Sequence, residues 1–525
     1  MRIRAFTACI VTFLSISTSL LTAQFREYDR SRFAISADRN RLIILADMGN
    51  EPDEMQQMIH MITCSNEFDL EGLIAVTGKY LRPGASLGEY NRVTHPELFL
   101  KIIDAYETVL NNLRDHAAGW PEPSYLRSIV AAGQKGYGME DVGIGKSSEG
   151  SELILKAAAR EDNRPIWVVV NAGSNTLAQA LIDYQNNHSR NEMDAFVSKL
   201  RVYENGAQDN AGAWICHRFP KIHWIRSNYQ TYAYGGPGGK DGELTKNLGP
   251  VYWLPYENSV EGQLEWQKEH IMNGHGALGE IYPERRFHGF SDGGLGFMEG
   301  GGTIPWMGLV NKGLFHIDHP SWGGWGGRFS RKKTADFWSR HKDIKQDEEK
   351  VTPFYTYREV SDSWTDPGDG HVYNNNFVPV WRWREAMYND QICRMDWCVK
   401  SYEEANHHPV AVCNGDVSNS IITYHAIAGE IVHLDASAST DPDGDEISYL
   451  WWIYQEAGTY PGNVGIRDPH SAVTRVTIPT GAAGKQIHLI LEIRDNNSIA
   501  PLFDYRRIVL DVDEITMEHK SIQVD

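Results

Sequence analysis

The segment RLIILADMGNEPDEMQQMIHMI, residues 41–62, decides the fold of this chain. It begins with a run of Leu and Ile that is typical of a buried strand, and it continues with apolar residues at helical spacing. Between the two lie Asp47, Glu51, Asp53 and Glu54, four carboxylates within eight positions. Mutual repulsion disfavours so many negative charges unless a cation binds among them. Two interpretations stay open: a site for a hard cation such as Ca²⁺, or acidic residues that cap the helix that follows.

Alternation of strand and helix continues from this segment to about residue 230. Expected strands are LIILAD, LEGLIAVTG, PIWVVVNAG, KLRVYENG and KIHWIRSN, and the helices among them include PELFLKIIDAYETVLNNL and SNTLAQALIDYQ. Near-continuous runs of Val, Ile and Leu separated by helices predict an α/β fold with a mainly parallel sheet flanked by helices. In such a sheet, ligands bind beyond the carboxyl ends of the strands, which is where the acidic turn is expected.

Two further parts follow along the chain. Residues 231–328 are rich in Gly, Trp and Tyr, and loops of this length in a compact domain are usually functional. Short runs of alternating apolar and polar residues then predict a small C-terminal β-sandwich over residues 409–525. The α/β domain is accordingly expected at residues 36–405.

Residues 1–23 are expected to be a secretory signal peptide. Arg2 and Arg4 precede a short apolar run, and LTA before Gln24 is a suitable cleavage site. A membrane anchor is the alternative, although the run is short and contains Ser and Thr. No later stretch is long and apolar enough to span a bilayer, so the mature protein is expected to be soluble and secreted or periplasmic.

Charge and cysteine content exclude several classes of protein. The formal net charge is -19, which disfavours nucleic acid and anionic membranes as partners. Outside the signal peptide there are five cysteines, which are widely spread and odd in number. This is not the pattern of a disulfide framework, so the cysteines are expected to be buried, small apolar residues.

A second strand end carries polar residues. WVVVNAGSNTLAQAL places Asn171, Ser174 and Asn175 between a strand and a helix. Together with the acidic turn, this segment resembles the nucleoside hydrolase superfamily. The order of NEPDE, GYGMEDVGIGKSS, NTLAQAL, QDNAG, HPSWGGWGGR and RMDW more closely resembles a bacterial family described as cellulose-binding, which has a nucleoside hydrolase-like domain and a C-terminal sandwich-like domain.

The resemblance implies a Ca²⁺ site at the acidic turn. Asp47 matches the first aspartate of the superfamily's turn, a calcium ligand and the general base for a metal-bound water. Asp53 and Glu54 match the acidic pair that follows, which is divided between sugar hydroxyls and metal. Asn175 matches the position whose backbone carbonyl reaches the metal.

The remaining site residues implied by the resemblance lie later in the chain. Gln208, Asp209 and Asn210 of QDNAG fall where the superfamily has polar residues that contact the sugar. A late aspartate that binds metal and sugar has no clear match, and the candidates are Asp318 as a metal ligand and Glu299 as a substrate contact.

Three departures from the superfamily change the expected substrate. The spacing from Asp47 to the acidic pair is longer, and the second member of that pair is Glu54 rather than Asp. Lys79 and Tyr80 stand where the superfamily has an early Asn. Base recognition therefore does not carry over, and a free nucleoside is not the expected substrate.

The loops offer aromatic and acidic groups. Trp322 and Trp325 of SWGGWGGR either stack on sugar rings or form a core corner where backbones pass closely, and sugar contact is the preferred interpretation. A leaving-group acid is needed, and the loop histidines that could act are His217, His288 and His319.

The C-terminal domain has one acidic turn and one aromatic pair. Asp441, Asp443 and Asp445 of STDPDGDEISYLWW resemble the turn of PKD-like sandwich domains, as a solvated Asx-type turn or as a structural calcium site. Trp451 and Trp452 point to opposite faces of a regular strand, so only one faces the sandwich core. The other is exposed to a polysaccharide or meets the first domain.

Two functions from different classes follow. The first is a secreted, calcium-dependent glycoside hydrolase that acts on sugars derived from plant or algal polysaccharides. The second is a non-catalytic protein that binds cellulose or another glycan on a hydrolase-like fold. A nucleoside salvage enzyme fits poorly with export and with the extra domain.

Overall fold

The computed structural model describes residues 39–50, 52–84, 94–234, 261–284, 298, 300–310, 313–314, 316–334, 353–367 and 370–513. The predictions for the signal peptide and for Glu51, His288 and Glu299 lie outside these residues.

The larger part of the molecule is built on an eight-stranded sheet in the order β3-β2-β1-β4-β5-β6-β8-β7. The strands are β1 (Asn40–Ala46), β2 (Phe68–Ala75), β3 (Val130–Ala132), β4 (Ile166–Val170), β5 (Leu200–Asn205), β6 (His223–Ser227), β7 (Phe329–Thr334) and β8 (Phe354–Glu359). All neighbours pair in parallel except β7 and β8, which are antiparallel. The predicted mainly parallel α/β sheet is confirmed, with β1 near its middle.

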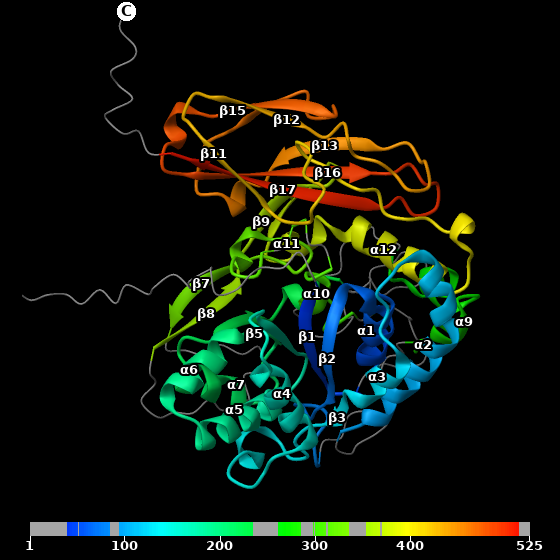
Figure 1. Ribbon diagram of the computed structural model, residues 1–525, viewed down its shortest axis with the longest axis vertical. Helices are drawn as coiled ribbons and strands as arrows, with labels where there is room; N and C mark the ends of the chain where they lie inside the picture. The colour runs from blue at the N-terminus through cyan, green and yellow to red at the C-terminus, as the bar shows by residue number, and fades with distance from the viewer. Residues whose placement is uncertain are drawn as a thin grey trace, which may run out of the picture.

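Helices cover both faces of the sheet (Figure 1). They are α1 (Pro52–Thr63), α2 (Pro96–His116), α3 (Pro123–Ser128), α4 (Glu149–Ala159), α5 (Asn175–Asn187), α6 (Arg190–Lys199), α7 (Ala211–Arg218), α8 (Leu264–Gln267), α9 (Gly276–Glu280), α10 (Thr303–Met307), α11 (Val378–Trp381) and α12 (Arg384–Asp396). Alternate residues of β1 face opposite layers, so Ile43 packs with α4–α7 and Ile44 packs with α1, α2, α10 and α12. Both faces of the sheet are covered by packed side chains, which explains the near-continuous apolar runs in the sequence.

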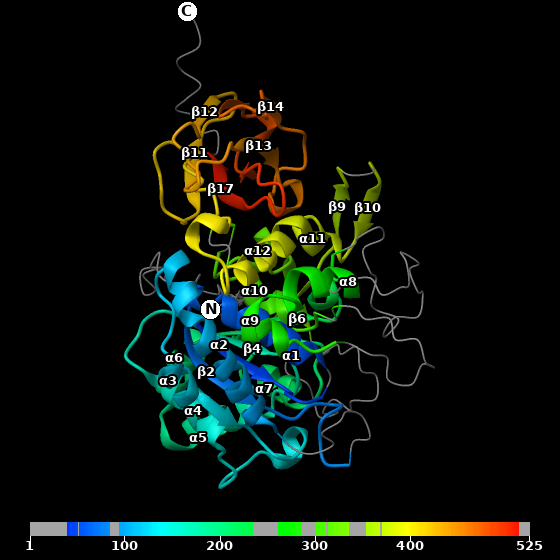
Figure 2. The same cartoon turned by 90° about the vertical axis from the view of Figure 1, so that its right-hand side faces the viewer.

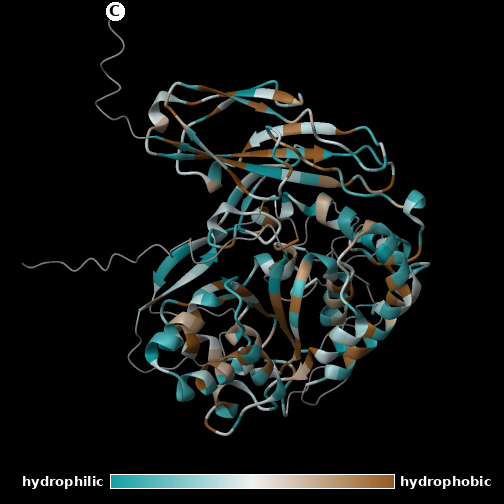
Figure 3. Cartoon of the chain, in the orientation of Figure 1, coloured by the Kyte–Doolittle hydropathy of each residue, from teal (hydrophilic) through white to brown (hydrophobic). Residues whose placement is uncertain are grey.

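Two mainly antiparallel sheets form the C-terminal domain, in the orders β11-β17-β16-β13 and β12-β15-β14; the pair of β11 and β17 is parallel. The strands are β11 (Ile422–Ala426), β12 (Ile431–Asp435), β13 (Ser448–Ile453), β14 (Gly465–Arg467), β15 (Val473–Thr477), β16 (Gln486–Arg494) and β17 (Phe503–Val512). A core of buried apolar residues lies between the two sheets, as expected for the predicted sandwich. Figure 3 shows hydrophobic residues along β16, one of the central strands of the larger sheet.

The aromatic pair of β13 divides between two environments. Trp451 is buried in the sandwich core, whereas Trp452 packs against Trp383 of the first domain, with ring centroids 5.6 Å apart. The acidic turn nearby is an Asx-type turn, because Oδ1 of Asp441 accepts bonds from the backbone N–H groups of Asp443 and Asp445. A calcium ion at this turn stays a prediction.

The two domains share a continuous hydrophobic layer that includes residues of α12, β16 and β17. Arg507 of β17 is fully buried and donates hydrogen bonds to the carbonyl oxygens of Leu314 and Gly323, at 3.1 and 2.9 Å. A hairpin of β9 (Asp362–Thr365) and β10 (Val372–Asn375) projects from the body on the side of α11 and α8 (Figure 2).

The state of the cysteines and the hydropathy of the helices were also predicted. Cys64, Cys216, Cys393, Cys398 and Cys413 are all buried and free. In the part of the chain that the structure describes, no helix is both long enough and apolar enough to cross a membrane.

Candidate functional site

The carboxyl ends of β1, β2, β4 and β5 lie at the same end of the sheet, which we call its carboxyl edge. The register pairs Ala46 with Ala75 and Leu45 with Val170, so Asp47, Gly78 and Asn171 follow their strands at about the same level. The packing there is close: a Cβ atom on Gly78 would lie 2.6 Å from Oε1 of Gln208 and 3.1 Å from Oδ2 of Asp47. Glycine at this position therefore lets the two side chains approach the β2 turn.

Asp47 and Glu54 form a buried pair of carboxyl groups. They are 1% and 3% exposed, and they are hydrogen-bonded to each other. Asn50 donates from Nδ2 to Oδ2 of Asp47 at 3.1 Å, and Gln57 donates from Nε2 to Oε2 of Glu54 at 2.5 Å. Burial raises the pKa of Glu54 well above its usual range, and the charges of Asp53 and Asp47 raise it further. Without a cation, the pair therefore retains a proton at pH values where an exposed Glu has lost it.

The loop before α10 closes this edge of the sheet. Gly301 lies beside Asp53, since a Cβ atom there would come within 2.9 Å of Oδ2. Gly302 has a φ of +83° and leaves room for the amides of Asn171 and Gln57, each of which would come within 2.7 Å of a Cβ atom at this position. Only glycine combines this backbone conformation with so close an approach.

Several buried side-chain amide atoms at this edge have no hydrogen-bond partner among the described residues. They are Oδ1 of Asn50, both amide atoms of Asn171, and Oδ1 of Asn175. A buried polar atom left in this state is costly unless a ligand, an ion or water satisfies it. Carboxylate and amide oxygens are the ligands that Ca²⁺ prefers.

A Ca²⁺ ion fits one subset of the predicted ligands. Within the described part of the chain, Asp47, Asp53 and Glu54 do not form a group in which three carboxylate oxygens, one from each residue, all lie within 4.8 Å of one another. The hydrogen-bonded Asp47 and Glu54, together with the amide oxygens of Asn50 and Asn171, are the better set. Asp53 is half-buried beside Gly301 and is suited to a ligand outside that set.

Asp209 and Asn175 hold two helices in place. The carboxylate of Asp209 accepts bonds from the backbone N–H groups of Asn175 (3.1 Å) and Ala211 (2.9 Å), which begin α5 and α7. Burial raises the pKa of Asp209 to about 7, although these backbone hydrogen bonds lower it. The side-chain amide of Asn175 donates to the carbonyl oxygen of Gly136 at 3.0 Å. Both residues therefore organise the strand ends, and Asn175 lies at the edge where the sequence predicted it.

Gln208 and Asn210 also bond to backbone. Gln208 donates to the carbonyl oxygen of Asn171 (3.1 Å) and accepts from the N–H of Lys79 (3.2 Å). Oδ1 of Asn210 accepts from the N–H of Met139 at 2.9 Å. QDNAG thus links loops at the edge of the sheet, and its predicted contact with sugar finds no support in these bonds.

The prediction that Asp318 binds the metal is wrong. Oδ1 of Asp318 is 2.8 Å from Nη2 of Arg201, which stands near the amino end of β5. Arg201 is level with Trp167 and hence with Leu42, five residues before Asp47, or roughly 16 Å away along the strands. Asp318 belongs to residues 313–314 and 316–328, which we call the return segment, and it lies near the amino end of β5, opposite to Asp47.

Neither of the two described candidate histidines reaches the carboxylates, and His217 lies in the last turn of α7 rather than in a loop. His319 stacks on Trp322, next to Asp318, with ring centroids 4.2 Å apart. His217 packs edge-on against Phe354 at the amino end of β8, at 4.7 Å. These two are therefore wrong as leaving-group acids at the Asp47 turn.

The interpretation of SWGGWGGR as a core corner is the right one. Trp322 and Trp325 are 9% and 3% exposed, and Trp322 also meets the ring of His488 from β16 at 4.8 Å. The backbones of Gly308 and Gly326 pass so closely that an added Cβ on Gly308 would clash with the other backbone at 2.5 Å. The predicted stacking of these tryptophans on sugar is wrong, because they are buried at the contact between the two domains.

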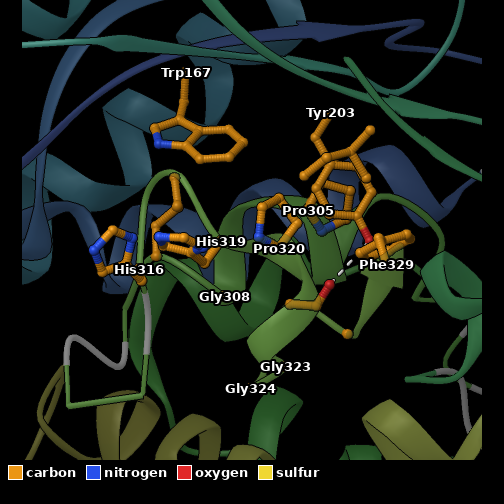
Figure 4. A pocket seen from close by; sticks show the side chains of 14 residues that line it. Trp167, Tyr203, Pro305, Gly308, His316, His319, Pro320, Gly323, Gly324 and Phe329 are labelled. Carbon is orange, nitrogen blue, oxygen red and sulfur yellow. Dashed lines mark hydrogen bonds between the residues drawn. The ribbon is translucent and has the colours of Figure 1, made fainter. Parts of the chain in front are cut away.

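A pocket opens beside this corner, with about 460 Å³ of empty space (Figure 4). Trp167 and Tyr203 of the sheet line one wall, and His319, Phe329 and glycine backbone line the other. It lies over one face of the sheet, on Trp167 of β4, Tyr203 of β5 and Ile225 of β6, and none of the acidic residues of the turn lines it.

Sequence reasoning missed an aromatic row that runs from the carboxyl end of β6 to the β9–β10 hairpin. The row consists of Tyr229, Phe377, Trp381, Tyr373 and Trp364, with successive ring centroids 6.1, 5.4, 5.6 and 6.2 Å apart. Tyr373 and Trp364 are directly opposed on the two strands and are half-buried. The signal was SWTDPGDGHVY, a turn motif between two short strands, each with an aromatic residue.

Comparisons with known proteins agree on the relatives of this chain. Residues 41–329 match a family model described as cellulose-binding Sde182, nucleoside hydrolase-like domain. Residues 431–512 match a model described as cellulose-binding protein Sde0182, C-terminal domain. No curated protein matches the chain. A solved structure, titled as a nucleoside hydrolase-related hypothetical protein from Saccharophagus degradans that is associated with carbohydrate metabolism, is 37% identical, covers 90% of this chain and 100% of its own, and has a TM-score of 0.73.

Proposed function

Because the chain belongs to the family described as cellulose-binding Sde182 with a nucleoside hydrolase-like domain, we propose that it is an exported, carbohydrate-active protein that hydrolyses glycosidic bonds with the help of Ca²⁺. One observation carries the proposal: the buried Asp47–Glu54 pair lies among orphaned amide oxygens at the carboxyl ends of the strands. Natural proteins seldom keep such a destabilising cluster without a functional reason. The substrates we propose are sugars derived from plant or algal polysaccharides.

The residues that would hold the ion are Asp47, Glu54, Asn50 and Asn171. Bound Ca²⁺ supplies a positive charge that makes a water more acidic and orients sugar hydroxyl groups. Asp47 takes the proton of the attacking water, as a general base within the buried pair. Asp53, half-buried at the mouth of the turn, accepts a hydrogen bond from a sugar hydroxyl.

The hairpin end of the aromatic row, Trp364 and Tyr373, provides a surface for a polysaccharide chain, whereas Phe377 and Trp381 are buried beneath it. The faces of sugar rings are apolar, so half-buried Trp and Tyr rings suit them. The row begins at Tyr229, which closely follows the strand end of β6, and Tyr232, three residues later, lies beside Gly301 and Asp53. Buried Phe377 and Trp381 separate the hairpin pair from Tyr229, so the hairpin is proposed as a glycan contact distinct from the carboxylates.

A glycan-binding protein without catalysis is the second candidate. Two observations favour it: the three described acidic side chains of the turn do not converge on one point, and neither His217 nor His319 is near them. Calcium binding separates the two candidates, because the hydrolytic proposal depends on it and the binding proposal does not.

Calorimetric titration of the mature protein with Ca²⁺ tests the hydrolytic proposal. The variants are Asp47→Asn, which keeps the shape of the side chain, and Asp194→Asn as a control at an exposed position of α6. Saturable binding in the native protein and in the control, lost in Asp47→Asn, supports the metal centre. Cellulose and hemicellulose oligosaccharides are then screened for new reducing ends that require Ca²⁺.

The opposite result is equally clear. If Ca²⁺ does not bind the native protein, the calcium mechanism fails. Co-sedimentation with insoluble cellulose then shows whether the glycan-binding candidate stands by itself.

A further inference from the structure

A second cluster of potential ligands lies at the far end of α1, away from the acidic turn. It consists of His60, Cys64 and Asp390, and one ligand atom of each lies within 4.8 Å of the other two. Within the described part of the chain, it is the one group of three such side chains with this spacing. His60 and Cys64 are four residues apart at the end of a helix and thus lie on the same side, and Asp390 faces them from α12. All three side chains are buried.

His60 is the least satisfied member of the cluster. It is 1% exposed, and neither of its ring nitrogens has a hydrogen-bond partner among the described residues. The rings of Trp306 and Tyr234 pack against it, at 5.1 and 5.9 Å between centroids. Leaving both nitrogens of a buried imidazole unsatisfied is costly. Burial also lowers the pKa of His60 to about 3, which keeps the ring in the neutral form that binds metals.

Asp390 is already held as a metal-binding carboxylate usually is. Its oxygens accept bonds from Nε of Arg394 at 2.9 and 3.0 Å, and Nε2 of His408 lies 3.0 Å from Oδ1. Burial by itself would raise the pKa of Asp390, but Arg394 and His408 hold it well below its usual range. Such outer partners fix the orientation of ligating side chains. A carboxylate has about four lone-pair sites, so one remains for an ion.

Charge also favours a divalent cation. Arg394 is shared between Asp390 and Glu67, whose Oε1 lies 3.4 Å from Nη2. One guanidinium, one buried carboxylate and the partly exposed Glu67 carboxylate together carry one negative charge. A divalent cation that displaces the proton of the Cys64 thiol adds one positive charge and brings the total to zero.

We propose that His60, Cys64 and Asp390 bind a Zn²⁺-like cation with affinity for nitrogen and sulfur. Zn²⁺ takes imidazole nitrogen and carboxylate oxygen at roughly 2.0–2.2 Å and thiolate at about 2.3 Å, so ligand atoms within 4.8 Å of one another need only small movements. Cys64 releases its proton to solvent when the metal–sulfur bond forms. Thiolate and imidazole ligands select such a metal over Ca²⁺, which keeps this site distinct from the acidic turn.

The bound ion joins α1 to α12. Helix α1 has 12 residues and carries Asp53 and Glu54 in its first turn. Arg394 reinforces the same contact, because Nη1 donates to the carbonyl oxygen of Thr63 at 3.1 Å. The metal therefore has a positioning role for the helix on which two of the acidic residues stand.

The metal content of the mature protein, purified without chelator and dialysed against buffer with Zn²⁺, tests this inference. Elemental analysis is expected to give one zinc per chain. Replacement by Co²⁺ is expected to give a near-ultraviolet absorption band from thiolate-to-metal charge transfer. Cys64→Ser should lose the band and most of the zinc, whereas Cys398→Ser, a control at another buried free cysteine, should keep both.

Absence of zinc and of the cobalt band in the native protein overturns the proposal and leaves a buried water as the occupant. Retention of the band in Cys64→Ser overturns it as well. If Cys64→Ser does not fold, native protein stripped by a chelator is titrated with Co²⁺, and an unchanged spectrum counts against the site. Ca²⁺ binding measured on the zinc-free protein keeps this outcome separate from that of the acidic turn.

Discussion

Replacement of Glu54 by Gln should make the calcium-free protein more stable, by an amount that grows with pH. Glu54 is 3% exposed, and its pKa is raised by burial and by the charges of Asp53 and Asp47. In the unfolded chain, the same carboxyl group has its ordinary pKa of about 4.3. Between the two pKa values the folded state binds more protons than the unfolded state, so the native protein loses stability as the pH rises.

The size of the effect follows from this linkage. Each pH unit within that window costs the native protein about 1.4 kcal/mol, and the loss levels off above the pKa of the folded state. Glu54→Gln has no proton to lose, and the side-chain oxygen of Gln can still accept the bond from Gln57. The difference in unfolding free energy between the variant and the native protein should therefore widen as the pH rises above the range in which an exposed Glu ionises.

Urea unfolding in the presence of a chelator, followed by tryptophan fluorescence at several pH values, measures this difference. Glu149→Gln, at an exposed position at the start of α4, is the matched control and should follow the native curve. A gap between Glu54→Gln and the native protein that stays constant as the pH rises above that range would refute the reasoning. It would mean that Glu54 ionises no differently in the folded protein than in the unfolded chain.

Three further predictions concern the glycan surface and the frame of the site. Trp364→Ala should reduce the fraction of protein that sediments with insoluble cellulose at least several-fold, because it removes one ring of the Trp–Tyr pair on the hairpin. The control is Tyr125→Ala, at an aromatic residue of α3 that is 44% exposed, and it should sediment like the native protein. Arg226→Met should cost about 3–5 kcal/mol of unfolding free energy, because it leaves Glu204, fully buried and 2.5 Å from Nη2 of Arg226, without its counter-charge; equal urea midpoints would contradict this. Arg507→Ala should separate the melting of the two domains in a calorimetric scan, since it removes the two side-chain hydrogen bonds from β17 to the carbonyl oxygens of Leu314 and Gly323; a single unshifted transition would show that these two bonds do not couple the domains.

The sheet and the acidic turn could be predicted because their signals are local. An apolar run such as LIILA is buried on both faces in a parallel sheet, and the helix after Pro52 has its own apolar periodicity. A carboxylate that follows such a strand necessarily lies at the carboxyl edge. This is why Asp47, Glu54 and Asn175 were found where the sequence placed them, at one end of the sheet.

The predictions that Asp318 binds metal and that Trp322 contacts sugar failed because they depended on the path of a glycine-rich segment through the fold. Asp318 pairs with Arg201 at the opposite end of the strands, and Trp322 is covered by the C-terminal domain. Neither location leaves a trace in the residues around it. Glycine permits many backbone paths, so a composition that suits an open loop also suits a tight core corner.

By itself, the sequence determined the α/β frame, five of the eight strands of its sheet (β1, β2, β4, β5 and β6), the sandwich that follows, and the end of the sheet at which the carboxylates gather. Periodicity within one strand or helix is sufficient for each of these, because every element must bury its own apolar face. Only the tertiary structure decided which distant segments meet there: Gly301 beside Asp53, the hairpin aromatics in line with β6, and Asp390 against His60. Those contacts join residues up to several hundred positions apart, and they depend on the packing of complete layers rather than on any local pattern.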